Sequence, residues 1–132
     1  MDDKVCAFLE HNHSAAVATI KADGTPHVAR IGIGLMGDVV WSSGTRNRVR
    51  TRNLRRDPRA TLFVFDPRRW QAWMGIESHV RILDGPDAPE QNLELYRALA
   101  GEPDDVEEYL AAMVREERLI YEFTVDRTYG QY

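Results

Sequence analysis

A short junction of hydroxyl, glycine and arginine residues has the composition of an anion-binding site. Residues 42–50 read Ser-Ser-Gly-Thr-Arg-Asn-Arg-Val-Arg, where a strand is expected to end and a helix to begin at Thr45 or Asn47. Free N–H groups and the positive dipole end at a helix start favour an anion. Arg48 and Arg50, in the expected first turn, would add charge-assisted hydrogen bonds. The residues therefore predict a phosphate-like anion site, with a merely solvated arginine cluster as the alternative.

The arginine-rich segment contrasts with an acidic chain. The formal net charge is −4, yet residues 46–59 hold seven arginines and one acid, so this segment carries +6 and the remainder −10. Arg52, Arg55 and Arg56 fall on the side of the expected helix away from Leu54, as is typical of solvent-facing positions. The geometry therefore singles out the first arginines of the helix rather than all seven.

Other chemistries lack support in the sequence. The histidines and the single cysteine show no spacing typical of zinc ligands, and no nucleophile motif, dinucleotide fingerprint or phosphate-loop lysine motif occurs. A nucleic-acid-binding module using the arginine run is the alternative from another class, but the overall acidity opposes it. We therefore expect no metal and no nucleic-acid partner.

Length and composition indicate one ordinary globular domain spanning residues 1–132. Apolar residues make up 43% of the chain and charged residues 29%, and the apolar runs are far shorter than the roughly 20 residues of a membrane span. The chain opens with an acidic stretch rather than a secretory leader, and Cys6 cannot form an internal disulfide. These features predict a cytoplasmic protein without membrane contact.

The hydrophobic pattern predicts several short strands followed by a helical excursion and one returning strand. Helices are expected over residues 2–11, 45–57, 89–100 and 104–117, and strands over 15–21, 26–35, 39–43, 60–65, 70–83 and 119–125. This order favours a small closed antiparallel barrel. Because such a barrel has a narrow core, a large cofactor would lie outside it or between subunits.

Two tryptophans three residues apart offer aromatic surface. Trp70 and Trp73 could stack on a planar ligand, or serve the core or a dimer interface. We expect the second role for Trp73 and partial exposure for Trp70.

Two strings of residues resemble a known family. Ala-Thr-Ile-Lys-Ala-Asp-Gly-Thr-Pro-His-Val over 18–28, and Arg-Thr-Arg-Asn-Leu-Arg-Arg-Asp-Pro-Arg-Ala over 50–60, resemble the split β-barrel flavin- and deazaflavin-binding proteins related to pyridoxamine 5'-phosphate oxidase. Within that group the chain looks most like the actinobacterial coenzyme F420-dependent reductases. The likeness runs from about Phe8 to Gly130. It implies a mainly β fold, a six-stranded antiparallel split β-barrel of the FMN-binding type with short helices.

The resemblance also implies a cofactor site. Such proteins form homodimers with two cofactor grooves, each built from both subunits. By similarity, Ser43, Arg48 and Arg50 would hold the phosphate of coenzyme F420, in agreement with the anion site above. Arg50 stands where relatives often carry lysine, so the charge is kept but the donor geometry differs.

The ring of the cofactor would contact a second group of residues. By similarity, His27, Val28 and Arg30 would lie along the deazaflavin ring and ribityl chain. Trp70 of the partner subunit would cover the ring. One face of the 26–35 strand is small or polar, which suits a ligand close to the backbone.

The activity implied is hydride transfer from the reduced deazaflavin to a conjugated double bond of a small organic substrate. No catalytic acid–base residue is implied, although Arg30 or His27 could orient the substrate or relay a proton. The alternatives are an FMN-binding split-barrel oxidoreductase and a cofactor-binding protein without turnover.

Overall fold

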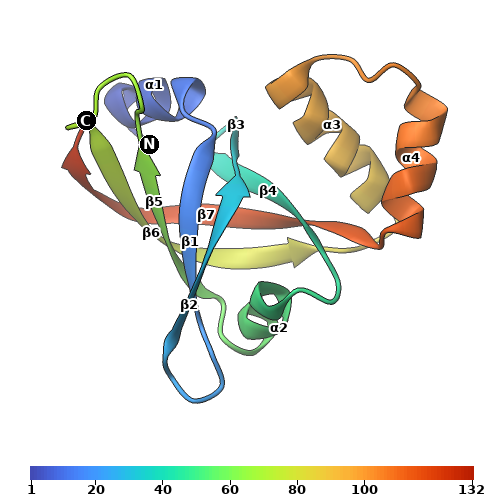
Figure 1. Cartoon of the computed structure of the whole chain (residues 1–132), viewed down its shortest axis with the longest axis horizontal. Helices are drawn as coiled ribbons and strands as arrows, with labels where there is room; N and C mark the ends of the chain where they lie inside the picture. The colour runs from blue at the N-terminus through green and yellow to red at the C-terminus, as the bar shows by residue number, and fades with distance from the viewer.

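The computed structural model describes all residues, 1–132, as one curled antiparallel sheet with four helices (Figure 1). The strand order is β2-β1-β5-β6-β7-β4-β3. The strands are β1 (Ser14–Ile20), β2 (Pro26–Gly32), β3 (Gly34–Met36), β4 (Val39–Thr45), β5 (Arg59–Phe65), β6 (Trp73–Leu83) and β7 (Arg118–Gln131), and the helices are α1 (Asp3–His11), α2 (Val49–Arg56), α3 (Ala88–Ala100) and α4 (Val106–Arg115). The predicted mainly β, split-barrel fold is confirmed, with seven strands in place of six.

The additional strand arises where the expected 26–35 strand breaks. β2 and β3 are the two edges of the sheet, and only Ile33 separates them along the chain. A hydrogen bond at this break joins the two sides of the sheet, because Ser42 Oγ on β4 donates to the Gly32 carbonyl of β2 at 2.6 Å. The Ile33 N–H donates to the His13 carbonyl at 2.8 Å. The chain therefore changes partner strand at Ile33, and this closes the sheet into a barrel.

Alternating apolar side chains fill the barrel. On β5, Leu62 and Val64 are fully buried, and Met74, Ile76 and Phe123 meet them from the neighbouring strands. Burying each such side chain contributes roughly 1.5–3 kcal/mol. The core is thus an apolar interior without room for a large ligand, as expected for a small barrel.

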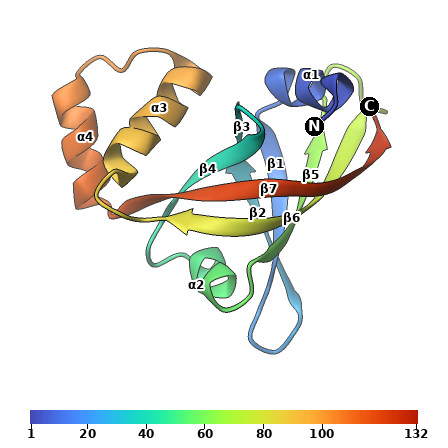
Figure 2. The same cartoon turned by 180° about the vertical axis from the view of Figure 1, so that it is seen from behind.

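The helices occupy three different places around the barrel (Figures 1 and 2). α1 lies over one end, next to the β5–β6 turn and the chain's C-terminus, and buries Val5, Phe8 and Leu9. α2 lies at the other end of the barrel, beside the β1–β2 hairpin. α3 and α4 form a pair beside the barrel, where Leu95 packs with Trp41 and Ile120. The two barrel ends are therefore built from different parts of the chain.

The boundaries of the last two strands differ from the sequence prediction. β7 extends to Gln131 because it pairs with β6 along that strand's whole length, with a bulge at Glu77/Ser78. Trp70 precedes β6, which begins at Trp73, because residues 66–72 form a turn held by the Asp66 N–H on the Ala72 carbonyl. No helix of the chain combines the length and apolar character needed to cross a membrane.

Candidate functional site

The predicted anion site lies where β4 gives way to α2, although the helix begins later than expected. Thr45 is still paired with Arg118 in the sheet, so its backbone is extended and the helix starts only at Val49. Arg48 is the N-cap residue, and Thr51 Oγ1 donates back to the Thr45 carbonyl at 2.7 Å. The first turn contains no acidic residue and no side-chain cap. Its N–H groups and positive dipole end are therefore left without an anionic partner within the chain.

Arg48 and Arg50 differ from every other arginine of the protein, because their side chains form no hydrogen bond or ion pair. Arg55 pairs with Asp84 at 2.8 Å, and Arg59 pairs with Asp57 at 2.8 Å. The hydrogen bond from Arg59 lowers the pKa of Asp57 to about 2, so this acid is already engaged. The remaining arginines donate to carbonyls, hydroxyls or carboxylates. The two unpaired arginines are those that the sequence pattern selected.

Arg50 is held in place by an aromatic ring. Its guanidinium carbon lies 5.8 Å from the centre of the Tyr121 ring, within the range of a cation–π contact. The Tyr121 hydroxyl hydrogen-bonds Thr51, and Gly44 leaves the space that the ring fills. The Nε atom of Arg50 is buried and has no partner. A buried donor without a partner is costly, which indicates that an acceptor from outside the chain is expected here.

His27 carries the second unpartnered buried side-chain atom of the protein, Nδ1. His27 pairs across the sheet with Thr19, whose hydroxyl accepts a hydrogen bond from Asn53 Nδ2 at 3.0 Å. Asn53 lies on α2, three residues after Arg50 and thus on the same side of the helix. The Asn53–Thr19 hydrogen bond therefore joins the helix that carries Arg50 to the strand that pairs with His27. The sequence analysis assigned no site role to Asn53 or Tyr121. Asn53 is part of the 50–60 string that resembles the family, whereas Tyr121 lies in a distant strand outside both strings.

Val28 and Arg30 lie on the other face of β2 from His27. Val28 is 63% exposed, and Arg30 Nη1 approaches Ser14 Oγ at 3.4 Å on the outside of the barrel. Side chains alternate along a strand, so the structure does not bring these two residues and His27 to one face of a single protomer. Their contacts with a cofactor ring stay a prediction.

Ser43 also points away from the arginines. Its hydroxyl is hydrogen-bonded to Asn92 Oδ1 on α3, whereas the neighbouring Ser42 faces the barrel interior. The alternation along β4 places Ser43 on the side of the sheet that α3 covers. The structure therefore does not bring Ser43 together with Arg50, and its phosphate contact stays a prediction.

Trp70 lies at the opposite end of the barrel from α2. Its side chain is 83% exposed in the β5–β6 turn, while α2 precedes the start of β5. Within one protomer, Trp70 and Arg50 cannot share a ligand. An exposed aromatic surface lies near the same end. In it, the centre of the Phe63 ring is 5.6 Å from the Trp73 ring, on which it stacks, and 6.1 Å from the Phe65 ring. The sequence signal for this surface is the alternation of the two phenylalanines with Leu62 and Val64, which are buried on the opposite face of β5.

The family assignment follows from a match along the whole chain. The family described as Pyridoxamine 5'-phosphate oxidase matches residues 1–132. The chain belongs to this family. It is an oxidoreductase-type family of split barrels that bind flavin-type cofactors, which fits the anion site at the start of α2.

Solved structures share the fold of this family member at low sequence identity. A conserved hypothetical protein from Mycobacterium tuberculosis has a TM-score of 0.79 and 21% identity, covering 97% of this chain and 82% of the other. A protein named F420 reductase has a TM-score of 0.76 and 23% identity, covering 95% of both chains. A putative pyridoxamine 5'-phosphate oxidase from Listeria innocua has a TM-score of 0.73 and 14% identity, covering 97% of this chain and 95% of the other.

Proposed function

We propose that this protein is a coenzyme F420-dependent oxidoreductase that reduces a conjugated double bond of a small organic substrate. The observation that carries the proposal is the pair of unpartnered arginines, Arg48 and Arg50, at a helix start with no local acid. A similar fold in a protein named F420 reductase supports the choice of cofactor.

The residues present suit the charged tail of such a cofactor. Arg48 and Arg50 would donate charge-assisted hydrogen bonds to its phosphate, aided by the free N–H groups of the first turn of α2. His27 Nδ1 and Arg50 Nε would then gain the partners that they lack in the free chain. The cofactor, when bound, supplies the hydride, and the protein's task is to position the reactants and exclude water.

A second protomer would complete the site. Phe63 is 44% exposed and Phe65 47% exposed on the outer face of the sheet, which is unusual surface for a small monomer. We propose that this aromatic face is buried in a homodimer. The dimer would bring Trp70 of the partner subunit toward Arg50, which the protomer's own Trp70 cannot reach.

The test is a fluorescence titration with F420. The wild-type protein should quench or shift the cofactor's emission, and the Arg48→Ala/Arg50→Ala double variant should bind at least about tenfold more weakly. Arg52→Ala is the matched control, because Arg52 lies on the same helix and donates only to the Asn47 carbonyl. Sedimentation of the same samples should give two protomers per particle.

Two results would contradict the proposal. No spectral change at high micromolar F420 would reject this cofactor. If Arg52→Ala weakened F420 binding as much as the double variant does, binding would depend on the overall positive charge of the helix and not on Arg48 and Arg50. The family match also supports FMN as the cofactor, so the titration is run with FMN in parallel. Oxidation of the reduced cofactor only when a conjugated substrate is added would distinguish an enzyme from a cofactor-binding protein without turnover.

A further inference from the structure

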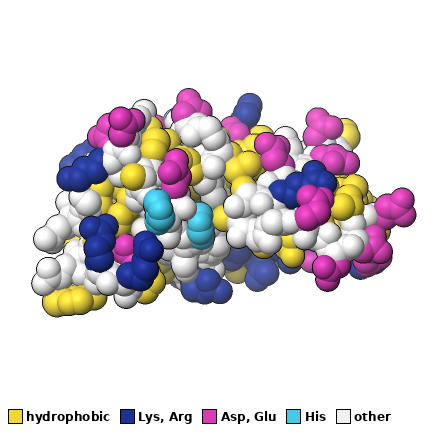
Figure 3. Space-filling model, turned by 90° about the horizontal axis from the view of Figure 1, so that it is seen from above, with side chains coloured by type: hydrophobic (Ala, Val, Ile, Leu, Met, Phe, Trp, Pro, Cys, Tyr) yellow, Lys and Arg dark blue, Asp and Glu magenta, His cyan; other side chains and the backbone are white.

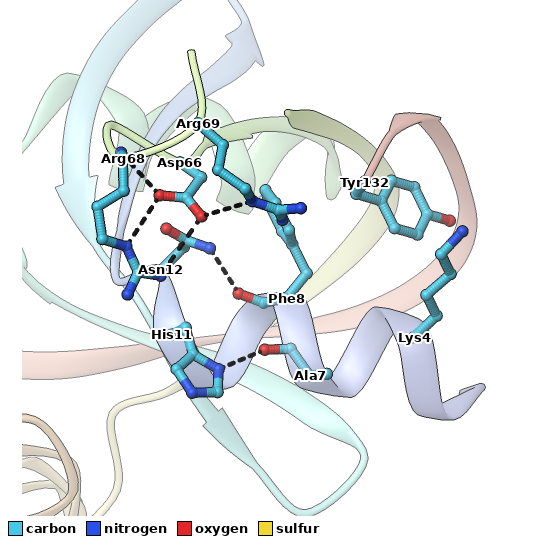
Figure 4. Close-up of a pocket in the computed structure, with 9 residues that line it drawn as sticks. All are labelled: Lys4, Ala7, Phe8, His11, Asn12, Asp66, Arg68, Arg69 and Tyr132. Atoms are coloured by element: carbon cyan, nitrogen blue, oxygen red, sulfur yellow. Dashed lines mark hydrogen bonds and ion pairs between the residues drawn. The ribbon is translucent and has the colours of Figure 1, made fainter. Parts of the chain in front are cut away.

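A cavity of about 550 Å³ lies between α1 and the β5–β6 turn, at the barrel end that does not carry α2. Figure 4 shows its lining, which comes from α1, from the turn over residues 66–69 and from the C-terminal Tyr132. Its volume falls in the range of small-molecule sites. Neither Arg48 nor Arg50 lines it, so the anion site at α2 does not account for it.

The face of α1 that lines the cavity is basic and apolar. Lys4, Ala7, Phe8 and His11 line it, at the spacing of one helical stripe. The acidic residues of the same helix, Asp3 and Glu10, are absent from the lining. Figure 3 shows this end of the molecule, where acidic side chains are most frequent over α3 and α4 and most basic side chains lie toward the opposite side. The helix therefore presents positive charge to the cavity.

The turn contributes two arginines held by one buried carboxylate. Asp66 is only 3% exposed and accepts hydrogen bonds from Arg68 Nε and Nη2, at 3.2 and 3.3 Å, and from Arg69 Nε at 3.3 Å. Both Nη nitrogens of Arg69 are therefore free to form the two-pronged contact that carboxylates accept. Among the side chains that line the cavity, Lys4, Arg68 and Arg69 are cationic and only Asp66 is anionic, so the side chains carry a net charge of +2.

The remaining lining offers an apolar surface and one polar ring atom. The Phe8 and Tyr132 rings lie 5.9 Å apart, and Lys4 Nζ is 5.9 Å from the centre of the Tyr132 ring. His11 Nδ1 contacts the Ala7 carbonyl at 2.8 Å. Since a carbonyl only accepts, Nδ1 carries the proton, and Nε2 is the ring nitrogen left for a ligand.

We propose that this cavity binds a small organic acid, with a carboxylate on the free side of Arg69, an apolar body along Ala7 and Tyr132, and a second anionic group near Lys4. Asp66 fixes the guanidinium groups before the ligand arrives, so little side-chain freedom is lost on binding. The inference does not depend on the cofactor proposed for α2.

Calorimetric titration with isophthalate, a flat dicarboxylate, tests this proposal. The wild-type protein should bind isophthalate but not its neutral diamide. Arg69→Ala should weaken binding by about tenfold or more, and Lys4→Ala by a smaller factor. Arg115→Ala is the matched control, because Arg115 is an equally exposed arginine, paired with Glu108 on α4. Thermal unfolding of each variant confirms that the comparison is made between folded proteins.

Each contrary result would overturn the proposal. Equal binding of the diamide would show that charge is not recognised, and equal weakening by Arg115→Ala would show attraction by overall charge only. F420 is titrated against Arg69→Ala in the same series. If F420 binding falls as far as isophthalate binding, the cavity belongs to the cofactor groove, whereas failure of F420 to bind any variant contradicts only the function proposed for α2.

Discussion

The two ends of the barrel use arginine in opposite ways. At the α1 end, Arg68 and Arg69 are fixed by Asp66, an acid two and three residues earlier in the same turn. At the α2 end, Arg48 and Arg50 have no such acid, and the Nε of Arg50 is buried without a partner. An arginine with an acid in its own turn is organised by the chain itself. One without an acid depends on a group from outside the chain.

The unsatisfied end carries an energetic cost. A buried donor without a partner costs about 1–3 kcal/mol, and His27 adds a second unpartnered atom nearby. The barrel core offsets this cost, because it buries a continuous set of apolar side chains. Such a cost at one end only, beside a helix start, is typical of a site that the fold maintains for binding rather than for stability.

The largest effect is expected from filling the space that Gly44 leaves beneath Arg50. A Cβ at this position would overlap the ring of Tyr121, which is fully buried and tied to Thr51 through its hydroxyl. The ring cannot move aside without losing that bond, so Gly44→Ala should lower the free energy of unfolding by about 3 kcal/mol. Urea denaturation measures the change.

Gly85→Ala is the control for this substitution. An added Cβ at Gly85 meets nothing within 4 Å, so its unfolding free energy should change by less than about 1 kcal/mol. Equal effects of the two substitutions would show that the α2 end is not built around the Tyr121 ring.

The sequence could single out the candidate site at α2 because its signal is local. The end of the strand, the glycine and the first arginines of the helix all lie within the nine residues 42–50. The structure leaves Arg48 and Arg50 unpaired, as a binding role requires. The contacts that complete the site are not local. Asn53 reaches Thr19 from 34 positions away, and Tyr121 reaches Thr51 from 70 positions away. Hydrophobic pattern predicts the strands that carry such residues but not which side chains meet.

Strand boundaries failed where tertiary pairing decided them. The 26–35 segment reads as one strand, but closure of the barrel requires a break at Ile33. The glycines on either side of it, Gly32 and Gly34, are compatible with such a break, although they also fit the small face of one continuous strand. The Ser43 prediction came from the family resemblance and stays a prediction, but the register of β4 with β7 turns the Ser43 side chain toward α3. The strand break and the direction of the Ser43 side chain both depend on the edge and the face that the sheet assigns to each residue.

A smaller effect is expected at the α1 end, as a change in pH dependence. The hydrogen bond from Arg68 lowers the pKa of Asp66 from 3.8 to about 2. A lowered pKa in the folded state means that the carboxylate stabilises the fold above pH 4, and that this contribution is lost as the pH falls toward 2. Asp66→Asn should therefore make the fall in unfolding free energy between pH 4 and pH 2 less steep.

Denaturant unfolding at a series of pH values measures this slope. Asp57, whose pKa is also about 2, keeps part of the slope in the variant. Asp38→Asn, in the exposed β3–β4 turn, is the control and should follow the wild-type curve. An unchanged slope in Asp66→Asn would mean that the arginines of this turn are not organised by Asp66.

The smallest change in unfolding free energy is expected for Arg50→Ala, and this substitution tests the contrast between the two barrel ends most directly. Arg50→Ala removes the cation–π contact with Tyr121, which destabilises the fold, but it also removes a buried donor that has no partner, which stabilises it. Because these two effects oppose each other, the unfolding free energy should change by less than about 0.5 kcal/mol. Arg56→Ala removes hydrogen bonds to the Ile20 carbonyl and to Asn53, and should cost about 1 kcal/mol. Both are measured by urea denaturation without cofactor. If Arg50→Ala destabilised the free protein more than Arg56→Ala, Arg50 would serve the fold, and the contrast between the two barrel ends would not hold.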